Sequence, residues 1–218
     1  MRKTLFSGIA ACLLATAATA AEQSPSVIWT VGQADRSASE FALAPDRFRD
    51  FLANDFGYED KYFLVGHSVP AADFPYVLPG PADTWGGTWP TSGWRTHQVN
   101  ILFGLKEIPS DGTCTLVVDL LDYAKNFLPL VKVSVNTQDA KFQLDAPGLC
   151  VADQRKPNQM EKIVDTLSIT GNLAKATPRR LEIPIRPGVL KAGGNEVTIT
   201  VLEGSWILFD RVSLEGPA

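Results

Sequence analysis

The chain has 218 residues, of which 45% are hydrophobic and 20% charged, and its formal net charge is −4. This hydrophobic fraction is ordinary for a globular protein, so the composition excludes a wholly disordered chain. The negative charge, and the absence of any Lys/Arg cluster longer than Arg179-Arg180, exclude a nucleic acid as the partner. The same charge disfavours a polyanionic partner, although a local groove could escape this average.

The N-terminus has the parts of a secretory signal. Arg2 and Lys3 give a positive start, an apolar run follows, and Ala18-Thr19-Ala20 provides a cleavage site of the A-x-A type. The apolar run is shorter than the ~20 residues that a membrane span needs, so no span is expected. We predict that residues 1–20 are a cleaved signal peptide and that the protein is secreted or periplasmic. Lipid anchoring at Cys12, in a segment that loosely resembles a lipoprotein box, is the less favoured alternative.

The rest of the chain alternates apolar and polar residues with a period of two, which is typical of strands that bury one face. Strands are predicted, in chain order, at residues 27–31, 62–65, 99–105, 116–120, 131–135, 141–144, 164–170, 181–185, 197–201 and 206–214. Turn-forming residues separate some of them, at 109–112, 136–139 and 193–195.

A single helix is predicted at about residues 44–56, where Pro45 and Asp46 suit the first turn and apolar residues follow at helical spacing. Many short strands with so little helix predict an all-β fold, an antiparallel β-sandwich or jelly roll. Since no internal repeat and no linker interrupts the pattern, residues 21–218 are expected to form a single domain.

The loop at residues 35–40, after the first strand, combines carboxylates with hydroxyl groups. Such an oxygen-rich loop is a weak candidate for a structural Ca²⁺ site, with Asp35 and Glu40 as ligands. The alternative is an Asx-type turn followed by an exposed loop. No other cofactor is expected, because only His67 and His97 supply imidazoles and no zinc-ligand spacing occurs.

Residues 74–95 are the most informative segment. They hold three of the five tryptophans in a stretch too rich in proline and glycine to be a strand. Long loops in compact domains usually serve a function, and exposed indoles suit stacking against a sugar ring. The alternative is a cluster in which the tryptophans pack on one sheet. The candidate carbohydrate-binding residues are Trp85, Trp89, Trp94 and Tyr76 for stacking, with His67 and Arg95 as polar contacts.

The mature chain keeps two cysteines, Cys114 and Cys150, because Cys12 would leave with the signal. In an exported protein such a pair is expected to form a disulfide. Closing the loop between them would remove roughly 4 kcal/mol of unfolded-state entropy. The alternative is two buried thiols.

Asp210 interrupts the apolar face of the last predicted strand, which contains Trp206, Leu208, Val212 and Leu214. A carboxylate directed toward a core is costly unless it is hydrogen-bonded. We therefore interpret Asp210 as a structural residue, either re-aimed by a bulge or satisfied by backbone or hydroxyl donors.

Several sequence blocks, taken in order and spacing, together resemble one family. They are residues 27–35 (VIWTVGQAD) followed by Glu40-Phe41, then 62–66 (YFLVG), 99–105 (VNILFGL), 194–199 (GNEVTI) and 207–215 (ILFDRVSLE). The chain looks like the third, carbohydrate-binding-module-like domain of rhamnogalacturonan lyases of polysaccharide lyase family 4, which is a galactose-binding-like jelly roll. In those lyases the catalytic groups lie in a separate domain with no counterpart here, so the resemblance carries over no catalytic residue. It implies that Gly32, Asp35, Asp210 and Glu215 are fold determinants first.

Three functional hypotheses follow from the sequence. The leading one is an exported, noncatalytic carbohydrate-binding module for a plant-type or pectic, rhamnogalacturonan-like polysaccharide. The first alternative is a small polysaccharide lyase that acts on a uronate-containing polymer, with its base and carboxylate neutraliser drawn from His67, Tyr76, Lys61 and Arg95. The second alternative is a structural or adhesion module of a secreted complex.

Overall fold

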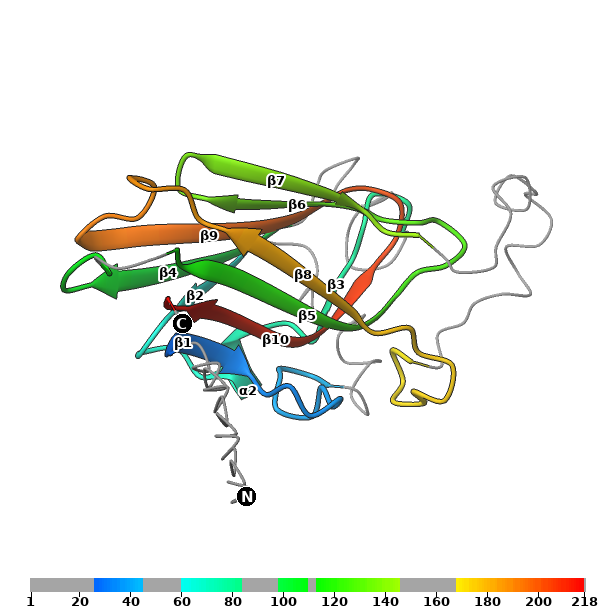
Figure 1. Ribbon diagram of the computed structural model, residues 1–218. Helices are drawn as coiled ribbons and strands as arrows, with labels where there is room; N and C mark the ends of the chain where they lie inside the picture. Colours follow the sequence, from blue (N-terminus) through cyan, green and yellow to red (C-terminus); the bar gives the residue numbers. More distant parts are fainter. Residues whose placement is uncertain (1–25, 45–59, 84–97, 110–112, 146–167, 218) are drawn as a thin grey trace, which may run out of the picture.

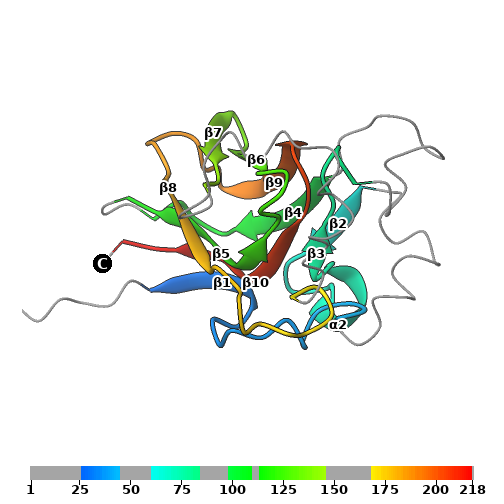
Figure 2. The same ribbon diagram turned by 90° about the vertical axis from the view of Figure 1, so that its right-hand side faces the viewer.

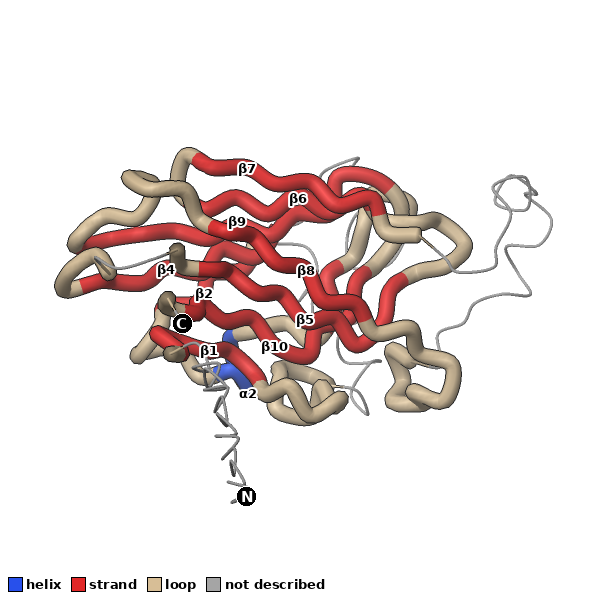
Figure 3. Tube along the Cα trace, in the orientation of Figure 1, coloured by secondary structure: helices blue, strands red, loops and turns tan. Residues whose placement is uncertain are grey.

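The computed structural model describes residues 26–44, 60–83, 98–109, 113–145 and 168–217 (Figure 1). Within these ranges the chain is almost entirely strand and turn, with one four-residue helix (Figure 3). The elements are β1 (Val27–Gly32), β2 (Lys61–Leu64), α2 (Pro70–Asp73), β3 (Val77–Leu78), β4 (Gln98–Leu105), β5 (Thr115–Tyr123), β6 (Leu130–Val135), β7 (Gln138–Gln143), β8 (Arg179–Pro184), β9 (Gly193–Glu203) and β10 (Ile207–Glu215).

The strands form two five-stranded sheets that pack face to face (Figures 1 and 2). The first sheet has the order β1-β10-β5-β8, and the short β3 pairs with β10 beside β1. The second sheet has the order β2-β4-β9-β6-β7. Among the strands of the described residues, all pairs are antiparallel except β2 with β4, which is parallel. The prediction of an all-β sandwich is therefore confirmed.

The core lies between the two sheets and consists of the side chains that the period-two pattern marks as inward. On the second sheet these include Val99, Ile101, Val133, Val197 and Ile199, all with no measurable exposure. Full burial of one such side chain contributes about 1.5–3 kcal/mol to folding, so the alternation both selects the strands and supplies most of their stability.

An aromatic cluster closes the sandwich beside α2. The ring of Phe74 lies 5.2 Å from the rings of Phe41 and Phe209 and 5.7 Å from that of Phe63. Gly32, at the end of β1, has a φ of +80°, and a Cβ there would lie 2.4 Å from the Phe41 ring. Only glycine fits this position, because both the backbone conformation and the close packing exclude a side chain.

Most predicted strands are confirmed, and the differences have physical reasons. Residues 168–170, the described part of the predicted strand 164–170, form a turn. Residues 193–195 were predicted as a turn and instead begin β9, because Gly194 and Asn195 pair with Gly104 and Phe103 of β4. Pairing with a distant strand thus overrides local turn chemistry. The predicted helix at 44–56 lies almost wholly outside the described residues.

Candidate functional site

Tyr76 was predicted as a sugar-stacking residue, and the structure shows that this is wrong. Its side chain is completely buried, and burial raises the pKa of its hydroxyl. The backbone explains the burial, since the Tyr76 carbonyl accepts a hydrogen bond of 2.9 Å from the amide of Phe209 just before β3 pairs with β10. Tyr76 therefore belongs to the core and cannot stack on an external ligand. The lyase hypothesis loses the same residue.

His67 is exposed in the turn that follows β2. Its amide donates to the Leu64 carbonyl at 3.0 Å, and the Ser68 hydroxyl accepts a hydrogen bond of 3.0 Å from the Leu64 amide. The turn thus covers part of an otherwise open sheet edge. His67 follows the end of β2 that is opposite Lys61, so the fold places these two candidate lyase residues at different ends of the strand.

Trp85, Trp89, Trp94 and Arg95 lie outside the described residues, but the two residues that flank their segment are described. Asp83 precedes it and Gln98, the first residue of β4, follows it. Gln98 lies opposite Thr200 near the end of β9, and Ser205, just beyond β9, donates its hydroxyl hydrogen bond to Asp83. Both flanks are therefore fixed beside the same end of β9, at the right-hand end of the sandwich in Figure 1.

Asp83 joins residues 80–83 to residues 204–205, and we call this contact the junction. Its side chain is buried and accepts a hydrogen bond of 2.7 Å from the Gly80 amide in addition to that from Ser205. The Ala82 amide donates to the Gly204 carbonyl at 2.8 Å, so residues 80–83 lie directly against residues 204–205. Burial raises the pKa of Asp83 to about 7, against the opposing effect of its two hydrogen-bond donors. The junction holds a carboxyl group that is protonated more easily than an exposed one.

Asp35 and Glu40 accept hydrogen bonds within their own loop. The Asp35 carboxylate accepts from the Ser37 amide at 2.9 Å, as in an Asx turn, and the Glu40 carboxylate accepts from the Gln33 amide at 2.9 Å. Among the described residues no group of three or more His, Cys, Asp or Glu side chains is arranged to hold a metal ion. The hypothesis of a calcium site gains no support. The loop instead begins with an Asx-type turn, which was the alternative.

Asp210 is buried in β10 at a point where the pairing with β5 shifts register. Its carboxylate accepts a hydrogen bond of 3.1 Å from the backbone amide of Arg36. Burial raises the pKa of Asp210 to about 6, while this hydrogen bond lowers it. The two features expected from the sequence, a bulge and a backbone hydrogen-bond donor, are therefore both present. Through this hydrogen bond Asp210 links β10 to the loop after β1.

The outer face of the first sheet carries charges that are paired among themselves. Asp119 on β5 lies 2.9 Å from Arg211 and 3.4 Å from Arg180, which come from the neighbouring strands β10 and β8. Glu215 lies 3.3 Å from Arg211, and Glu182 lies 2.6 Å from Arg180. Two arginines thus meet three carboxylates, which leaves no excess of positive charge for an anionic ligand.

The outer face of the second sheet differs, because it exposes apolar and polar side chains side by side. Tyr62 and Leu64 on β2 are 62% and 43% exposed. Strand pairing places Tyr62 next to Asn100 of β4, which lies next to Thr198 of β9. The predicted strand at residues 62–65 includes Tyr62, but the sequence did not single it out as an exposed aromatic residue. The signal was the period itself, since Phe63 can face the core only if Tyr62 faces away.

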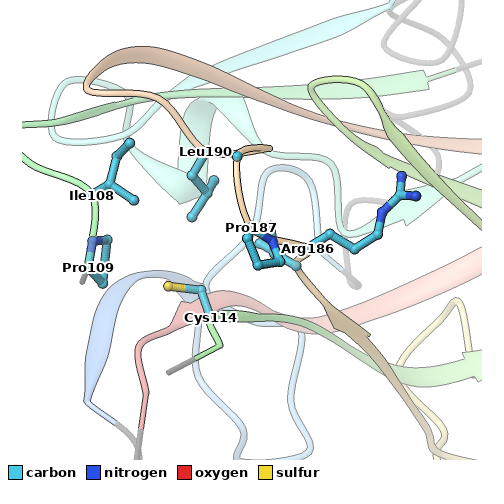
Figure 4. Close-up of a pocket in the computed structure, with 8 residues that line it drawn as sticks. Ile108, Pro109, Cys114, Arg186, Pro187 and Leu190 are labelled. Atoms are coloured by element: carbon cyan, nitrogen blue, oxygen red, sulfur yellow. The ribbon is translucent and has the colours of Figure 1, made fainter. Parts of the chain in front are cut away.

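A pocket of about 340 Å³ lies at the other end of the sandwich (Figure 4). Its walls come from the segments that flank β5, β8 and β9, and the Cys114 side chain points into it while the Arg186 side chain extends away. Burial raises the pKa of the Cys114 thiol. Cys114 is a free cysteine in the structure, and Cys150 lies outside the described residues, so the disulfide stays a prediction.

The family comparison decides the identity of this sandwich. Residues 27–214 match the family described as "CBM-like: Polysaccharide lyase family 4, domain III". The chain belongs to this family. Its members are carbohydrate-binding-module-like domains, so this CBM-like domain has a carbohydrate-related role. No curated protein sequence matches the chain.

Three solved structures illustrate the similarity of this CBM-like domain to parts of larger enzymes. They are a GH115 4-O-methyl-α-glucuronidase with specificity for decorated arabinogalactans (14% identity, TM-score 0.32), a cycloalternan-forming enzyme from Listeria monocytogenes (17%, 0.29) and a ruminal GH26 endo-β-1,4-mannanase (15%, 0.32). The alignments cover 58%, 53% and 67% of this chain but only 15%, 8% and 27% of those proteins. Within the described residues, no helix has the length and apolar character to cross a membrane.

Proposed function

We propose that the protein is an exported, noncatalytic carbohydrate-binding module for a plant-type or pectic, rhamnogalacturonan-like polysaccharide. The family match over residues 27–214 carries this proposal, because it covers both sheets with a CBM-like domain. In this proposal residues 1–20 are removed during export, and residues 21–218 act as one domain.

The geometry supports binding better than catalysis. A lyase needs a base and a carboxylate neutraliser that converge on one substrate atom. Of the four residues considered for these roles, Tyr76 is buried, and His67 lies at the far end of β2 from Lys61. Binding instead needs exposed aromatic and polar groups on a rigid support, which the second sheet provides through Tyr62.

Affinity electrophoresis of the mature chain in gels that contain pectic polymers or galactans tests the proposal. We expect retardation on at least one polymer and unchanged migration in gels without polymer. Trp85→Ala, Trp89→Ala and Trp94→Ala variants test whether the predicted tryptophan segment contributes. Equal migration of the wild type in every gel would overturn the proposal.

A further inference from the structure

Exposed apolar side chains gather on β2, the outermost strand of the second sheet, and in the turn that follows it (Figure 2). Among the described residues six large apolar side chains are exposed, and three of them are Tyr62, Leu64 and Val69, at 62%, 43% and 57%. Tyr62 and Leu64 are two residues apart on one strand, so both point away from the core that contains Phe63. Single apolar residues are normal on a surface, but a patch of them marks an interaction site.

Strand pairing extends this patch from β2 onto β4. Leu64 lies directly opposite Leu102, which points outward because Ile101 and Phe103 face the core, and which is half-buried. Side chains that are opposite on paired strands, or two apart on one strand, are separated by about 5–7 Å. We call Tyr62, Leu64 and Leu102 the apolar triad. It forms one continuous surface, about as wide as a single sugar ring.

The middle of the outer face is closed, which confines the accessible surface to the β2 edge. Asn100, beside Tyr62, is only 1% exposed, and Thr200 further along β9 is 8% exposed. The Asn100 side chain donates to the Lys61 carbonyl at 3.5 Å and accepts the hydroxyl hydrogen bond of Thr198 at 3.1 Å. These polar groups are satisfied within the protein. A ligand therefore contacts the apolar triad and its border and does not cross the whole sheet.

The backbone beneath the apolar triad is fixed, and its edge is closed to another strand. The Val65 amide donates to the Leu102 carbonyl at 2.9 Å, which holds β2 against β4. On the side away from β4, the Leu64 amide donates to the Ser68 hydroxyl, and the Leu64 carbonyl accepts from the amides of Ser68 and His67. Because these backbone groups are taken, a partner strand cannot pair with Leu64. A partner at this edge is therefore bound by side chains.

The charged side chain next to the apolar triad is acidic. Glu196 on β9 lies directly opposite Leu102, and its side chain is exposed. Its backbone is fixed on both sides, since its amide donates to the Asn136 side-chain oxygen at 3.0 Å and its carbonyl accepts from the Asn136 amide at 2.9 Å. A carboxylate accepts hydrogen bonds from sugar hydroxyl groups but repels the carboxylate of a uronate.

The outward charges on the strands of this sheet do not offset that repulsion. Within the described residues, Lys132 and Lys141 face three carboxylates, those of Asp139, Glu196 and Glu203. The Lys132 ammonium nitrogen lies 3.0 Å from the Asp139 carboxylate, so part of the positive charge is already paired. This face therefore has no excess of positive charge to attract an anionic polymer.

We infer that the apolar triad binds one uncharged hexopyranose ring of a pectic polysaccharide, with Tyr62 stacked on the C–H face of the ring and Glu196 accepting a hydrogen bond from a hydroxyl group. The inference rests on the proposed function and specifies the surface and the charge of the bound sugar. A galactose ring or a methyl-esterified galacturonate ring satisfies it, whereas a free galacturonate ring brings a second carboxylate close to Glu196.

The test compares the wild-type mature chain with four variants by isothermal titration. The probes are galactan oligosaccharides, oligogalacturonate, and the same oligogalacturonate after full methyl esterification. Tyr62→Ala removes the stacking ring and Tyr62→Phe keeps it. Glu196→Gln removes the charge but keeps an acceptor. Glu203→Gln is its control, with the same charge change roughly 23 Å along β9, beyond the Debye length of about 10 Å.

The wild type should bind both uncharged probes about threefold to fivefold more tightly than oligogalacturonate, and added salt should reduce this difference. Tyr62→Ala should weaken binding of every probe about tenfold, a loss of roughly 1.4 kcal/mol, while Tyr62→Phe stays close to the wild type. Glu196→Gln should bind oligogalacturonate about threefold more tightly, and Glu203→Gln should match the wild type. Thermal melts and sedimentation velocity establish that each protein is folded and monomeric.

The outcomes separate the inference from the proposed function. Wild-type binding that Tyr62→Ala leaves unchanged would overturn the inference and leave the proposed function standing. Tighter binding of oligogalacturonate than of its methyl ester, or equal effects of the two glutamate variants, would overturn the assignment of an uncharged sugar beside Glu196. Self-association that Tyr62→Ala abolishes would show that a second copy of the chain covers the apolar triad, and would also overturn the inference. Absence of wild-type binding to every probe and to every polymer in the electrophoresis would overturn the proposed function itself.

Discussion

Replacement of Asp83 by asparagine should make the protein more stable at pH 8 and leave its stability near pH 4 almost unchanged. Asparagine keeps the shape of the side chain and can still accept the Gly80 amide hydrogen bond, but it cannot ionise. In the folded protein burial raises the pKa of Asp83 from 3.8 to about 7, so the folded state binds its proton more tightly than the unfolded state. This contribution to stability is complete below about pH 4 and is lost as the pH rises through 7.

The pKa values set the size of the effect. A difference of about three pH units between the folded and unfolded states corresponds to roughly 4 kcal/mol between pH 4 and pH 8, taken as an upper bound. For a chain of this length that is about 10 °C in the melting temperature.

Thermal melts from pH 4 to pH 8 measure this effect. The wild type should lose stability across the range, and Asp83→Asn should lose much less. Asp210, whose pKa burial raises to about 6, contributes the same slope to both proteins and cancels in the comparison. Glu203→Gln, which removes an exposed carboxylate at the end of β9, should follow the wild type. Parallel curves for the wild type and Asp83→Asn, or a less stable Asp83→Asn at pH 8, would refute this reasoning.

Further predictions concern the core, one glycine and the cysteines. Phe74→Ala should cost about 3–5 kcal/mol in the free energy of unfolding by urea, because its buried ring contacts three other phenylalanines; a loss below 1 kcal/mol would contradict the described cluster. Gly204→Ala should destabilise by more than about 1 kcal/mol, whereas Gly188→Ala should cost less, since both have a φ of +80° but only Gly204 would place its Cβ 2.3 Å from a carbonyl oxygen. Thiol titration of the denatured, unreduced mature protein should find no free thiol if Cys114 and Cys150 are joined, and two thiols would show that they are not.

Much of the fold could be predicted from the sequence because it depends on a local signal. A strand that buries one face must alternate, so β1, β4, β5, β6 and β9 can be recognised without knowledge of their partners. The order of the strands and the pairing of β2 with β4 depend on contacts between distant residues. No local pattern reports these contacts.

In the candidate site too, the features that depend on contacts between distant residues could not be predicted from the sequence. Tyr76 was interpreted as part of an open loop because proline and glycine surround it, yet pairing of β3 with β10 places it in the core. Tyr62 was assigned to a strand, but its exposure depends on β2 forming a sheet edge whose outer side is uncovered at that residue.

The most direct test of the central claim is chemical-shift mapping of the isotope-labelled mature chain during titration with a pectic oligosaccharide. We predict that saturable changes include the exposed Tyr62, on the outer face of the second sheet. Residues that line the pocket around Cys114 should change little. Changes confined to that pocket or to the outer face of the first sheet, or no changes at saturating ligand, would contradict the account.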